Sequence, residues 1–535
     1  MMSNSADISE TRRRIEAAYD PELLRDAGRR LADMLANHLS KAQASDGVVL
    51  PWREPAENVQ EAAKALDEAV GADAGRDVLA DRFAGLLQTM LSHGHNLHDP
   101  RYIGHQVAAA VPLAGLFDAV GAVTNQVMAT YDMGPWATAA ERAMVERLGE
   151  QIGWRRGEFS GVVTHGGSLA NLTGLLTARN VTLGDSWERG TPGGGPSVKG
   201  DSPIFAETKI GTVPVKIGTV PGLPPVLVVH ADAHYSVSRS AGILGLGTGH
   251  VVRVGLDQRR RMDVCQLEST LRDLRAKNQL VVAAVACACS TPIGAFDPLE
   301  DVADVCQRYG VWLHVDAAHG GAACLSPKYR HLVAGLHRAD SIVWDAHKMM
   351  FMPGLCAFVF YRNRAHKFEA FRQDAPYLFD PAAPGLAEYD SAMGTVECTK
   401  RAAAFGLWGT WSLFGPQLFA DLVETTFTMG RVFYEKLSAA PDFVALHEPE
   451  CNIVVFRHVP SALRDATPKR LDQFQLELRR SVIESGEFYI VSTRLDGVGA
   501  LRVTIINPLT APEHLDRLLD AIREAGRQIL NNTTP

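Results

Sequence analysis

Two stretches in the middle of the chain, VWLHVDAAHGG at residues 311–321 and SIVWDAHKMM at residues 341–350, decide the fold class. In each stretch a largely apolar run ends at charged side chains, Asp316 in the first and the pair His347 and Lys348 in the second. Such runs are typical of strands that are buried on both faces of a parallel sheet. Because open parallel sheets bind ligands at the carboxyl ends of their strands, we expect Asp316 and Lys348 to share a charged ligand.

Similar apolar runs alternate with helical patterns through the middle of the chain. The runs are GVVTH, VLVVH, VVRV, VVAAVACA and CAFVFY, and amphipathic segments such as NLTGLLTARN and LEDVADVCQRYG lie between them. This alternation predicts an α/β domain with a mostly parallel sheet. After about Thr395 the pattern changes to a long helix, the run CNIVVFRH, a helix, the run ALRVTIIN and a last helix, which predicts a smaller α+β domain.

We therefore expect three parts, which are an N-terminal helical segment at 1–98, a large α/β domain at 99–394 and a small α+β domain at 395–535. Apolar residues recur at helical spacing in residues 12–43, which predicts an amphipathic arm that packs on a partner subunit or on its own chain. Residues 185–225 are rich in Gly and Pro, and they contain KIGTVPV followed directly by KIGTVPG at 209–222. Such a duplication is typical of a surface insertion, and we expect it to be mobile.

The composition excludes several classes of protein. With 46% apolar residues, 21% charged residues and a net charge of −8, the chain lacks the basic character of a nucleic-acid-binding protein. It has no run of the roughly 18 to 20 apolar residues that span a bilayer, and its polar start has no signal-peptide core. The cysteines form no CxxC pair, and the histidines of HGHNLH at 93–98 have no partner at ligand spacing. We expect a cytoplasmic protein that binds no nucleic acid, membrane or metal.

The chemistry of Lys348 and Asp316 indicates pyridoxal phosphate as the cofactor. A lysine in the apolar setting of SIVWDAHKMM loses hydration, which lowers its pKa and lets the free amine attack an aldehyde. A carboxylate at Asp316 keeps a pyridine nitrogen protonated, so that the ring can take up electrons. Each residue alone has an ordinary structural explanation, as a strand-end lysine or a helix-capping aspartate. Together they predict the cofactor.

Two further motifs and two single residues offer groups that this cofactor needs. THGGSLANL, at residues 164–172, stands at a strand-to-helix junction, where Gly167 and Ser168 can present backbone N–H groups to a phosphate. His234, in ADAHYSVSRS, follows the run VLVVH and can stack on the cofactor ring. His347 and Thr291 are polar groups that can line the same site. Each of these has a structural explanation when taken singly, so the assignment depends on their combination.

Together the motifs resemble the group II pyridoxal-phosphate-dependent amino acid decarboxylases, the family of glutamate, cysteine sulfinate, aromatic amino acid and diaminobutyrate decarboxylases. The resemblance runs from about His98 to Asn507, and its motifs occur in family order. They are DPRYIGHQ, MGPWATAAE, THGGSLAN, AHYSV, STPIGAFDPL, HVDAAHGG, DAHKMM, YLF, TVECTKR and LRVTIINP. The resemblance implies a PLP-dependent transferase of fold type I, with a mostly parallel seven-stranded sheet in the large domain, that is active as a homodimer.

The resemblance also implies a role for each matching residue. Lys348 would carry the cofactor as the internal aldimine, Asp316 would face the pyridine nitrogen, and His234 would stack on the ring. Thr291 would lie near the aldimine. The residues implied to hold the phosphate are Gly167, Ser168 and His347.

Further matches concern catalysis and the substrate. Tyr377, in PYLFDP, matches the mobile-loop tyrosine that protonates the substrate carbon, and it completes a catalytic set whose other members are Lys348, His234 and Asp316. Arg502, in LRVTIINP, matches a residue that binds the substrate α-carboxylate, and His105 falls where family members line the substrate pocket.

Three positions depart from the family pattern. His319 stands where the family has an aromatic residue after HVDAA, and Asp345-Ala346 replaces the usual Asn-Pro before His-Lys. The Cys-Gly-Arg motif of the glutamate and cysteine sulfinate branch is replaced by a triplet that ends in Lys400. These changes remove no catalytic group, but they leave the substrate open.

The implied reaction is the α-decarboxylation of an L-amino acid to the amine and CO₂. The expected substrate is small and polar or acidic, such as aspartate, glutamate, cysteine sulfinate or a diaminobutyrate-like amino acid. The alternatives are an aromatic amino acid decarboxylase and a decarboxylating aldehyde synthase, although the synthases replace the loop tyrosine that Tyr377 matches. Transamination shares the fold but not the motif order. An inactive PLP-binding scaffold would predict damage at Lys348, Asp316 or Tyr377, and all three are intact.

Overall fold

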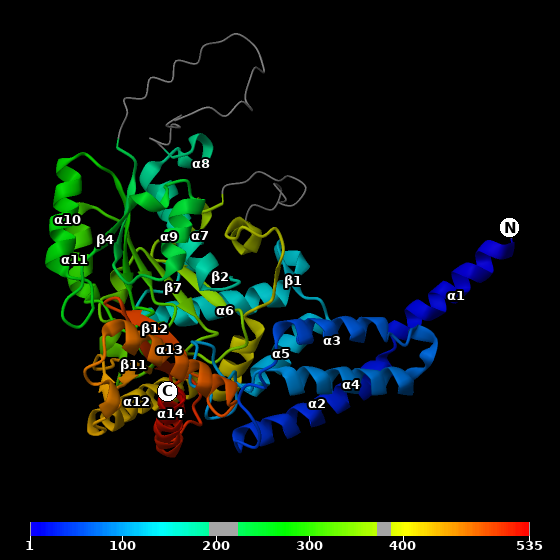
Figure 1. Cartoon of the computed structure of the whole chain (residues 1–535). Coiled ribbons are helices and arrows are strands. Elements are labelled where there is room, and N and C mark those ends of the chain that lie inside the picture. The colour runs from blue at the N-terminus through cyan, green and yellow to red at the C-terminus, as the bar shows by residue number, and fades with distance from the viewer. Residues whose placement is uncertain (1, 192–222, 372–386, 534–535) are drawn as a thin grey trace, which may run out of the picture. The chain divides into compact units, whose positions relative to one another are not determined.

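The computed structural model describes residues 2–191, 223–371 and 387–533 (Figure 1). The duplication at 209–222, with most of the predicted insertion, lies outside the described residues. Contacts divide the chain into two compact units, each described by itself: unit 1 is 1–109, 428–448 and 452–535, and unit 2 is 110–427 and 449–451. The three-part division expected from the sequence is a different partition, and it stays a prediction.

Unit 2 contains a seven-stranded sheet with the strand order β2-β8-β7-β6-β5-β3-β4. The strands are β2 (Ser160–Thr164), β3 (Val226–His230), β4 (Val251–Val254), β5 (Val281–Cys287), β6 (Leu313–Asp316), β7 (Ser341–Asp345) and β8 (Ala357–Tyr361). From β7 to β4 every neighbouring pair is parallel, whereas β8 pairs antiparallel with both β7 and β2. The predicted mostly parallel sheet is confirmed.

Both faces of this sheet are buried, which explains the unbroken apolar runs in the sequence. Successive side chains of a strand point to opposite faces, yet Ile342 and Val343 in β7 are both fully buried. One face packs against α7 (Gly167–Leu183) and α9 (Tyr235–Ile243) in a single apolar cluster. The strands also contact α6 (Pro135–Ile152), α10 (Val264–Ala276) and α11 (Leu299–Tyr309). In Figure 1, α10 and α11 lie on one side of β4 while α7 and α9 lie on the other.

Helix α7 approaches the sheet closely because it carries a glycine where it crosses β6. A Cβ at Gly174 would come within 2.7 Å of the Cε1 atom of His314. The close approach brings the first turns of α7 next to the carboxyl ends of β6 and β7. The other α-helices and strands in the described part of unit 2 are α5 (Pro112–Val123), α8 (Ser186–Arg189), the short pair β1 (Val127–Met128) and β9 (Lys400–Arg401), and the first part of α12 (Phe405–Ala439), which is kinked at Gly415.

The C-terminal part of unit 1 is an antiparallel sheet of four strands in the order β10-β11-β13-β12. The strands are β10 (Phe443–Ala445), β11 (Ile453–His458), β12 (Val491–Leu495) and β13 (Val498–Thr504). Asp496 and Gly497, with φ of 51° and 80°, form the two-residue turn between β12 and β13, as a tight hairpin requires. The helices α13 (Pro468–Glu484) and α14 (Pro512–Thr533) pack on this sheet around a core that includes Phe456 and Leu501. The predicted α+β part is confirmed.

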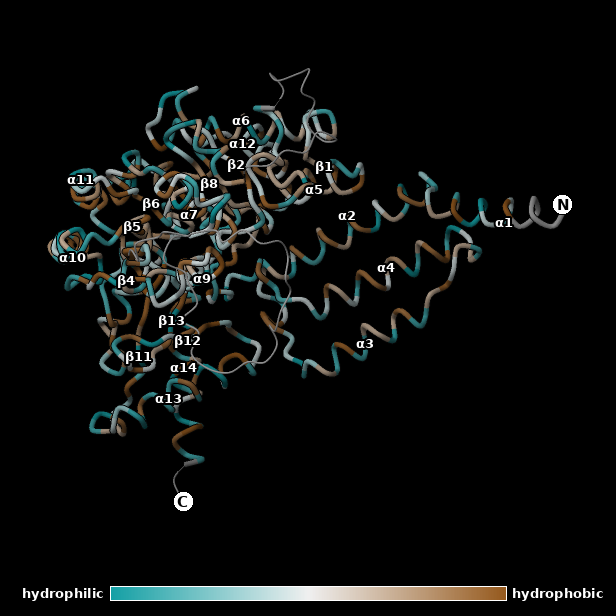
Figure 2. The backbone as a smooth tube through the Cα atoms, turned by 90° about the horizontal axis from the view of Figure 1, so that it is seen from above, coloured by the Kyte–Doolittle hydropathy of each residue, from teal (hydrophilic) through white to brown (hydrophobic). Residues whose placement is uncertain are grey.

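The N-terminal part of unit 1 is helical, as predicted. Its helices are α1 (Met2–Ala18), α2 (Pro21–Gln43), α3 (Pro55–Asp67) and α4 (Arg76–His93), and α2 packs against α4. Figure 2 shows hydrophobic positions recurring along α2, α3 and α4. Ala42 is the buried residue of α2, Ala80 is that of α4, and α3 has none. Within residues 2–191, 223–371 and 387–533, no helix is both long enough and apolar enough to cross a bilayer.

Candidate active site

Several strands of the unit 2 sheet end at one edge, and candidate residues follow each of them. Asp316 is the last residue of β6, Lys348 follows β7 in the chain, and Thr291 follows β5. His234 lies in the chain between β3 and α9, and Gly167 is the first residue of α7, which follows β2. These strands all run in the same direction, so their carboxyl ends meet at this edge, where open α/β sheets bind ligands. The fold therefore gathers residues that are widely separated in the sequence.

Lys348 is paired with a buried acid from its own turn. Its Nζ atom lies 3.1 Å from Oδ2 of Asp345, and the two side chains are 22% and 1% exposed. Burial lowers the pKa of Lys348, but the carboxylates of Asp345 and Asp316 outweigh this effect, so that the pKa is raised. The expectation of a lowered pKa is therefore wrong, because two acids face the amine.

Asp316 is held by a buried hydrogen-bond network. Its carboxylate accepts from Nδ2 of Asn171 at 3.0 Å and from the backbone N of Ala318 at 3.2 Å. Oδ1 of Asn171 lies 2.9 Å from Nε2 of His314, and Nδ1 of His314 lies 2.7 Å from the Ser341 hydroxyl. Because the amide oxygen of Asn171 can only accept a hydrogen bond, the proton of the His314 ring lies on Nε2. Burial lowers the pKa of His314 to about 4, although Asp316 acts in the opposite direction, so the ring is neutral at pH 7.

His234 joins the same network through Ser236. Its Nδ1 atom accepts from the backbone N of Ser236 at 3.3 Å and lies 2.8 Å from the Ser236 hydroxyl, so that His234 caps α9. Nδ2 of Asn171 donates to that hydroxyl at 3.0 Å. Burial has the largest effect on the pKa of His234 and lowers it. The charge of Asp316 raises this pKa and the charge of Lys348 lowers it, so that the net result is a decrease. Asn171 therefore orients both Asp316 and His234.

The residues of this network were missed by sequence reasoning. They are Asn171, Ser236, His314 and Ser341. Asn171 and Ser236 stand inside the motifs THGGSLANL and ADAHYSVSRS, and His314 interrupts an apolar strand. A polar side chain at a buried position of a helix or strand was the available signal, because such groups require hydrogen-bond partners.

The start of α7 has the features of a phosphate site. Gly166, with φ of 107°, is the N-cap residue of the helix, and it has no side chain that could cap the first N–H groups. A Cβ at Gly167 would come within 2.6 Å of Oδ2 of Asp345, so that glycine alone fits without movement. Ser168 is the second residue of the helix. Uncapped N–H groups and the positive end of the helix dipole favour a bound anion.

The side chain of His347 lies near the start of α7, between Asp345 and the residue before β8. Its Nδ1 atom is 2.9 Å from the carbonyl oxygen of Cys356, and its Nε2 atom is 3.5 Å from Oδ2 of Asp345. Oδ1 of Asp345 is buried, and it has no hydrogen-bond partner among the described residues. This set of groups fits pyridoxal phosphate: a lysine, two acids, an imidazole and the start of a helix. The buried Oδ1 atom of Asp345 would gain a hydrogen-bond partner from a ligand beside it.

Three of the predicted residues lie outside the described part of unit 2. Tyr377 lies outside the described residues. Arg502, on β13, and His105 belong to unit 1, where Arg502 is 7% exposed. Partial burial of the ring and the charges of Arg502 and Arg479 lower the pKa of His105. The roles of Tyr377, Arg502 and His105 stay predictions.

Lys400, one of the departures from the family pattern, forms a buried ion pair. Its Nζ atom lies 2.6 and 2.7 Å from the carboxylate oxygens of Glu141 and donates to the Val163 carbonyl at 2.8 Å. Glu141 also accepts from the backbone N of Val163 at 3.1 Å. The side chains of Lys400 and Glu141 are 2% and 6% exposed. The pair therefore supports the end of β2, shortly before the start of α7.

The arrangement of lysine, acid and helix start at the carboxyl edge of this sheet defines the class of the protein. It is a pyridoxal-phosphate-dependent enzyme of fold type I, in agreement with the sequence-based expectation.

Comparison with known proteins shows which kind of pyridoxal-phosphate-dependent enzyme this chain resembles. Residues 221–459 match the family described as the pyridoxal-dependent decarboxylase conserved domain. The acidic amino acid decarboxylase GADL1 of Mus musculus is 28% identical over 456 residues, which cover 84% of this chain and 78% of that protein. The cysteine sulfinic acid decarboxylase of Rattus norvegicus is 28% identical over 493 residues, which cover 90% of this chain and 92% of that protein.

A solved structure agrees with these sequence matches. The crystal structure of mouse CSAD superposes with a TM-score of 0.79 at 27% identity, and the match covers 94% of this chain and 98% of that chain. This chain contains a pyridoxal-dependent decarboxylase domain at residues 221–459 and is a PLP-dependent amino acid decarboxylase.

Proposed function

We propose that this enzyme removes the α-carboxylate of a small acidic L-amino acid, such as aspartate, glutamate or cysteine sulfinate, and releases the amine and CO₂. The observation that carries the proposal is the match of 84% to 90% of the chain to decarboxylases that are named for acidic amino acids. The buried Arg502 stands in the motif that binds the substrate α-carboxylate in the family, and it supports an α-amino acid as the substrate.

We assign the cofactor to the residues at the carboxyl edge of the unit 2 sheet, which are Lys348, Asp316, His234, Thr291, His347, Gly167 and Ser168. Bound pyridoxal phosphate supplies an electron sink for the electron pair that remains when CO₂ leaves. Asp316 provides a fixed negative charge, because Asn171 and the Ala318 N–H hold its carboxylate in one orientation.

The proton transfers are assigned to two groups. Lys348 holds or passes a proton at Nζ, and the Asp345 carboxylate at 3.1 Å stabilises the protonated amine. Tyr377 is the proposed donor of the proton that replaces CO₂ on the substrate carbon. Arg502 is assigned to the substrate carboxylate and His105 to the wall of the substrate pocket.

A CO₂-release screen tests the substrate. The panel contains aspartate, glutamate, cysteine sulfinate, 2,4-diaminobutyrate and the aromatic amino acids. We expect release from an acidic member, and Arg502→Met should raise KM by about 10- to 100-fold, which corresponds to a lost charged hydrogen bond. Arg457→Met, on the neighbouring strand β11, is the matched control and should leave KM unchanged. Release from aromatic amino acids alone would contradict the proposal, as would an aldehyde product.

We also propose that the enzyme acts as a homodimer. Helix α5 exposes Leu113, Leu116, Val120 and Val123, which recur at the spacing of one helical face, while Ala114 is fully buried. An exposed apolar stripe of this kind supports a protein–protein contact.

We further propose a cytoplasmic location. All eight cysteines are free thiols, and Cys265 and Cys398 among them are exposed. Free exposed thiols are typical of proteins that work in a reducing compartment.

A further inference from the structure

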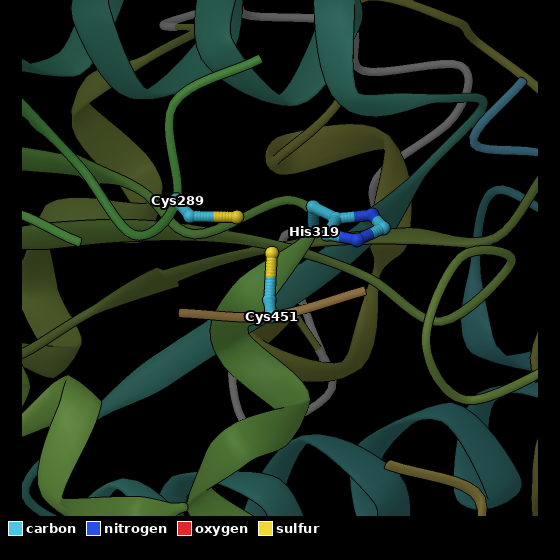
Figure 3. A group of neighbouring side chains, drawn as sticks. All are labelled: Cys289, His319 and Cys451. Carbon is cyan, nitrogen blue, oxygen red and sulfur yellow. The ribbon is translucent and has the colours of Figure 1, made fainter. Parts of the chain in front are cut away.

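Two cysteines and a histidine from distant parts of the sequence meet inside unit 2. Cys289 follows β5, His319 follows β6, and Cys451 lies in the short segment 449–451 that belongs to unit 2. Their ligand atoms all lie within 4.8 Å of one another. Figure 3 shows the two sulfur atoms turned toward each other, with the imidazole beside them.

The cluster is enclosed by the protein. Cys289 is 7% exposed, His319 3% and Cys451 1%. The proposed decarboxylation assigns no role to any of the three side chains. His319 is also one of the departures from the family pattern, which has an aromatic residue at that position. The family chemistry therefore does not explain why these groups converge.

The spacing of the ligand atoms suits a tetrahedral metal ion. With Zn–S bonds of about 2.3 Å and Zn–N bonds of about 2.0 to 2.1 Å, two ligand atoms of such a site are roughly 3.5 to 3.8 Å apart. The observed separations of at most 4.8 Å therefore require a contraction of at most about 1.3 Å. Small rotations of the side chains can provide a movement of this size.

The charges also suit a divalent ion. Two thiolates balance the two positive charges of the metal, and a neutral imidazole adds none, so the occupied site would carry no net charge into the protein interior. The present hydrogen bond of Cys451 is weak, since its Sγ atom lies 3.6 Å from the Gly294 carbonyl oxygen. A bound metal ion would replace the proton of each thiol.

We propose that Cys289, His319 and Cys451 form a binding site for a borderline or soft divalent cation of the Zn²⁺ type. Thiolate and imidazole ligands select this class over Mg²⁺ or Ca²⁺, which prefer oxygen ligands. The three side chains leave one position of a tetrahedral ion for water or a small molecule, as in sites with three protein ligands. The proposal does not depend on which amino acid is the substrate.

Metal analysis of the untagged holoenzyme tests the site. The background is Cys265→Ser/Cys398→Ser, which removes the two exposed thiols. After equilibration with ZnCl₂ and gel filtration, we expect about one zinc per chain by mass spectrometry of the metal. Cys289→Ser, Cys451→Ser and His319→Phe should each lower this content at least about tenfold. Cys306→Ser changes a buried thiol on α11 that is outside the cluster, and it should keep the zinc.

A second measurement keeps the test decisive if a cysteine variant fails to fold. His319→Phe restores the type of residue that the family has, and its fold can be followed by the visible absorption of the bound cofactor. Titration of the holoenzyme with Cd²⁺ should produce the ultraviolet absorption of cadmium thiolates, with saturation at about one ion per chain, and His319→Phe should weaken the binding.

Three results would overturn the proposal. The first is an absence of zinc above background in the protein equilibrated with ZnCl₂. The second is a zinc content that stays the same in folded His319→Phe and in folded Cys451→Ser. The third is a disulfide between Cys289 and Cys451 in freshly purified protein kept free of oxidant, because a disulfide leaves no thiolate ligands.

Discussion

Oδ2 of Asp345 lies 3.1 Å from Nζ of Lys348 at the edge of the unit 2 sheet. The family usually has asparagine where this chain has Asp345, so a neutral amide is replaced by a buried charge. Together with Asp316, this acid raises the pKa of Lys348 above its ordinary value of 10.5, although burial acts in the opposite direction. The amine must be neutral before it can attack an aldehyde. Asp345 therefore has a direct influence on how the protein without cofactor takes up pyridoxal phosphate.

The change Asp345→Asn should lower the pKa of Lys348 and speed cofactor uptake at neutral pH. Removing one nearby charge shifts a pKa by about one unit or more, which increases the neutral fraction of the amine by about tenfold. The measurement is the rate of cofactor binding by the apoenzyme as a function of pH. Asp273→Asn, at an exposed position of α10, is the control and should not change the profile. An uptake profile of Asp345→Asn that matches the wild type would contradict this role.

The same pair makes the stability of the apoenzyme depend on pH. A lysine whose pKa is raised by folding stabilises the protein fully below its unfolded value near 10.5, and the contribution is lost as the pH rises through the folded value. We therefore expect the wild-type apoenzyme to lose more stability than Asp345→Asn does between neutral and strongly alkaline pH. Urea denaturation at several pH values measures the difference. Parallel curves for the two proteins would show that the pair does not contribute.

Removing one partner of the Lys400–Glu141 pair should strongly destabilise unit 2. Lys400→Met leaves the Glu141 carboxylate buried, which costs about 3 to 5 kcal/mol of the free energy of unfolding. The double variant Lys400→Met/Glu141→Gln removes the charge as well, and it should recover part of the loss. Arg480→Ala breaks an exposed pair with Glu484 and should cost less than about 1 kcal/mol. Chemical denaturation measures all of these variants, and equal losses for the buried and exposed pairs would contradict the expectation.

Asn171→Ala should weaken cofactor binding without unfolding the enzyme. The change removes the hydrogen bond to Asp316, and a bond to a charged group is worth about 1.5 to 3 kcal/mol, or about 10- to 100-fold in affinity. The dissociation constant of pyridoxal phosphate is the measured quantity. Asn180→Ala is the matched control on the same helix, because Asn180 bonds to the backbone at Glu369 and Ala370, outside this network. A similar loss of affinity in both variants would indicate a general effect on α7.

The substitution Leu116→Glu should dissociate the proposed homodimer. It places a charge in the middle of the exposed apolar stripe of α5, where burial of an unpaired carboxylate at an interface is strongly unfavourable. Light scattering coupled to size-exclusion chromatography measures the mass. Leu476→Glu, at an exposed leucine of α13, is the control and should leave the mass unchanged. A variant at Leu116 that keeps the mass of the wild type would exclude α5 from the interface.

The sequence predicts those parts of the fold that leave a pattern in neighbouring residues, such as the apolar runs of the buried strands. Strands buried on both faces must be apolar throughout, so β6 and β7 are visible as runs, and the charged residues that end them mark the ligand edge. For this reason the sequence alone predicts Asp316 and Lys348 as site residues. The roles of Tyr377 and Arg502 came from motif matches alone, and they remain predictions.

The tertiary structure decided what depends on distance through space. Whether the pKa of Lys348 rises or falls depends on how close two carboxylates lie, and sequence spacing does not report that distance. The links from Asn171 to Asp316 and His314, and the meeting of Cys289, His319 and Cys451, join segments that are remote in the sequence. The sequence by itself determined the mostly parallel sheet and the cofactor, because burial imposes a local pattern on each strand and makes the charged residues at the strand ends visible. Contacts between remote side chains leave no such pattern, because chain folding alone brings them together.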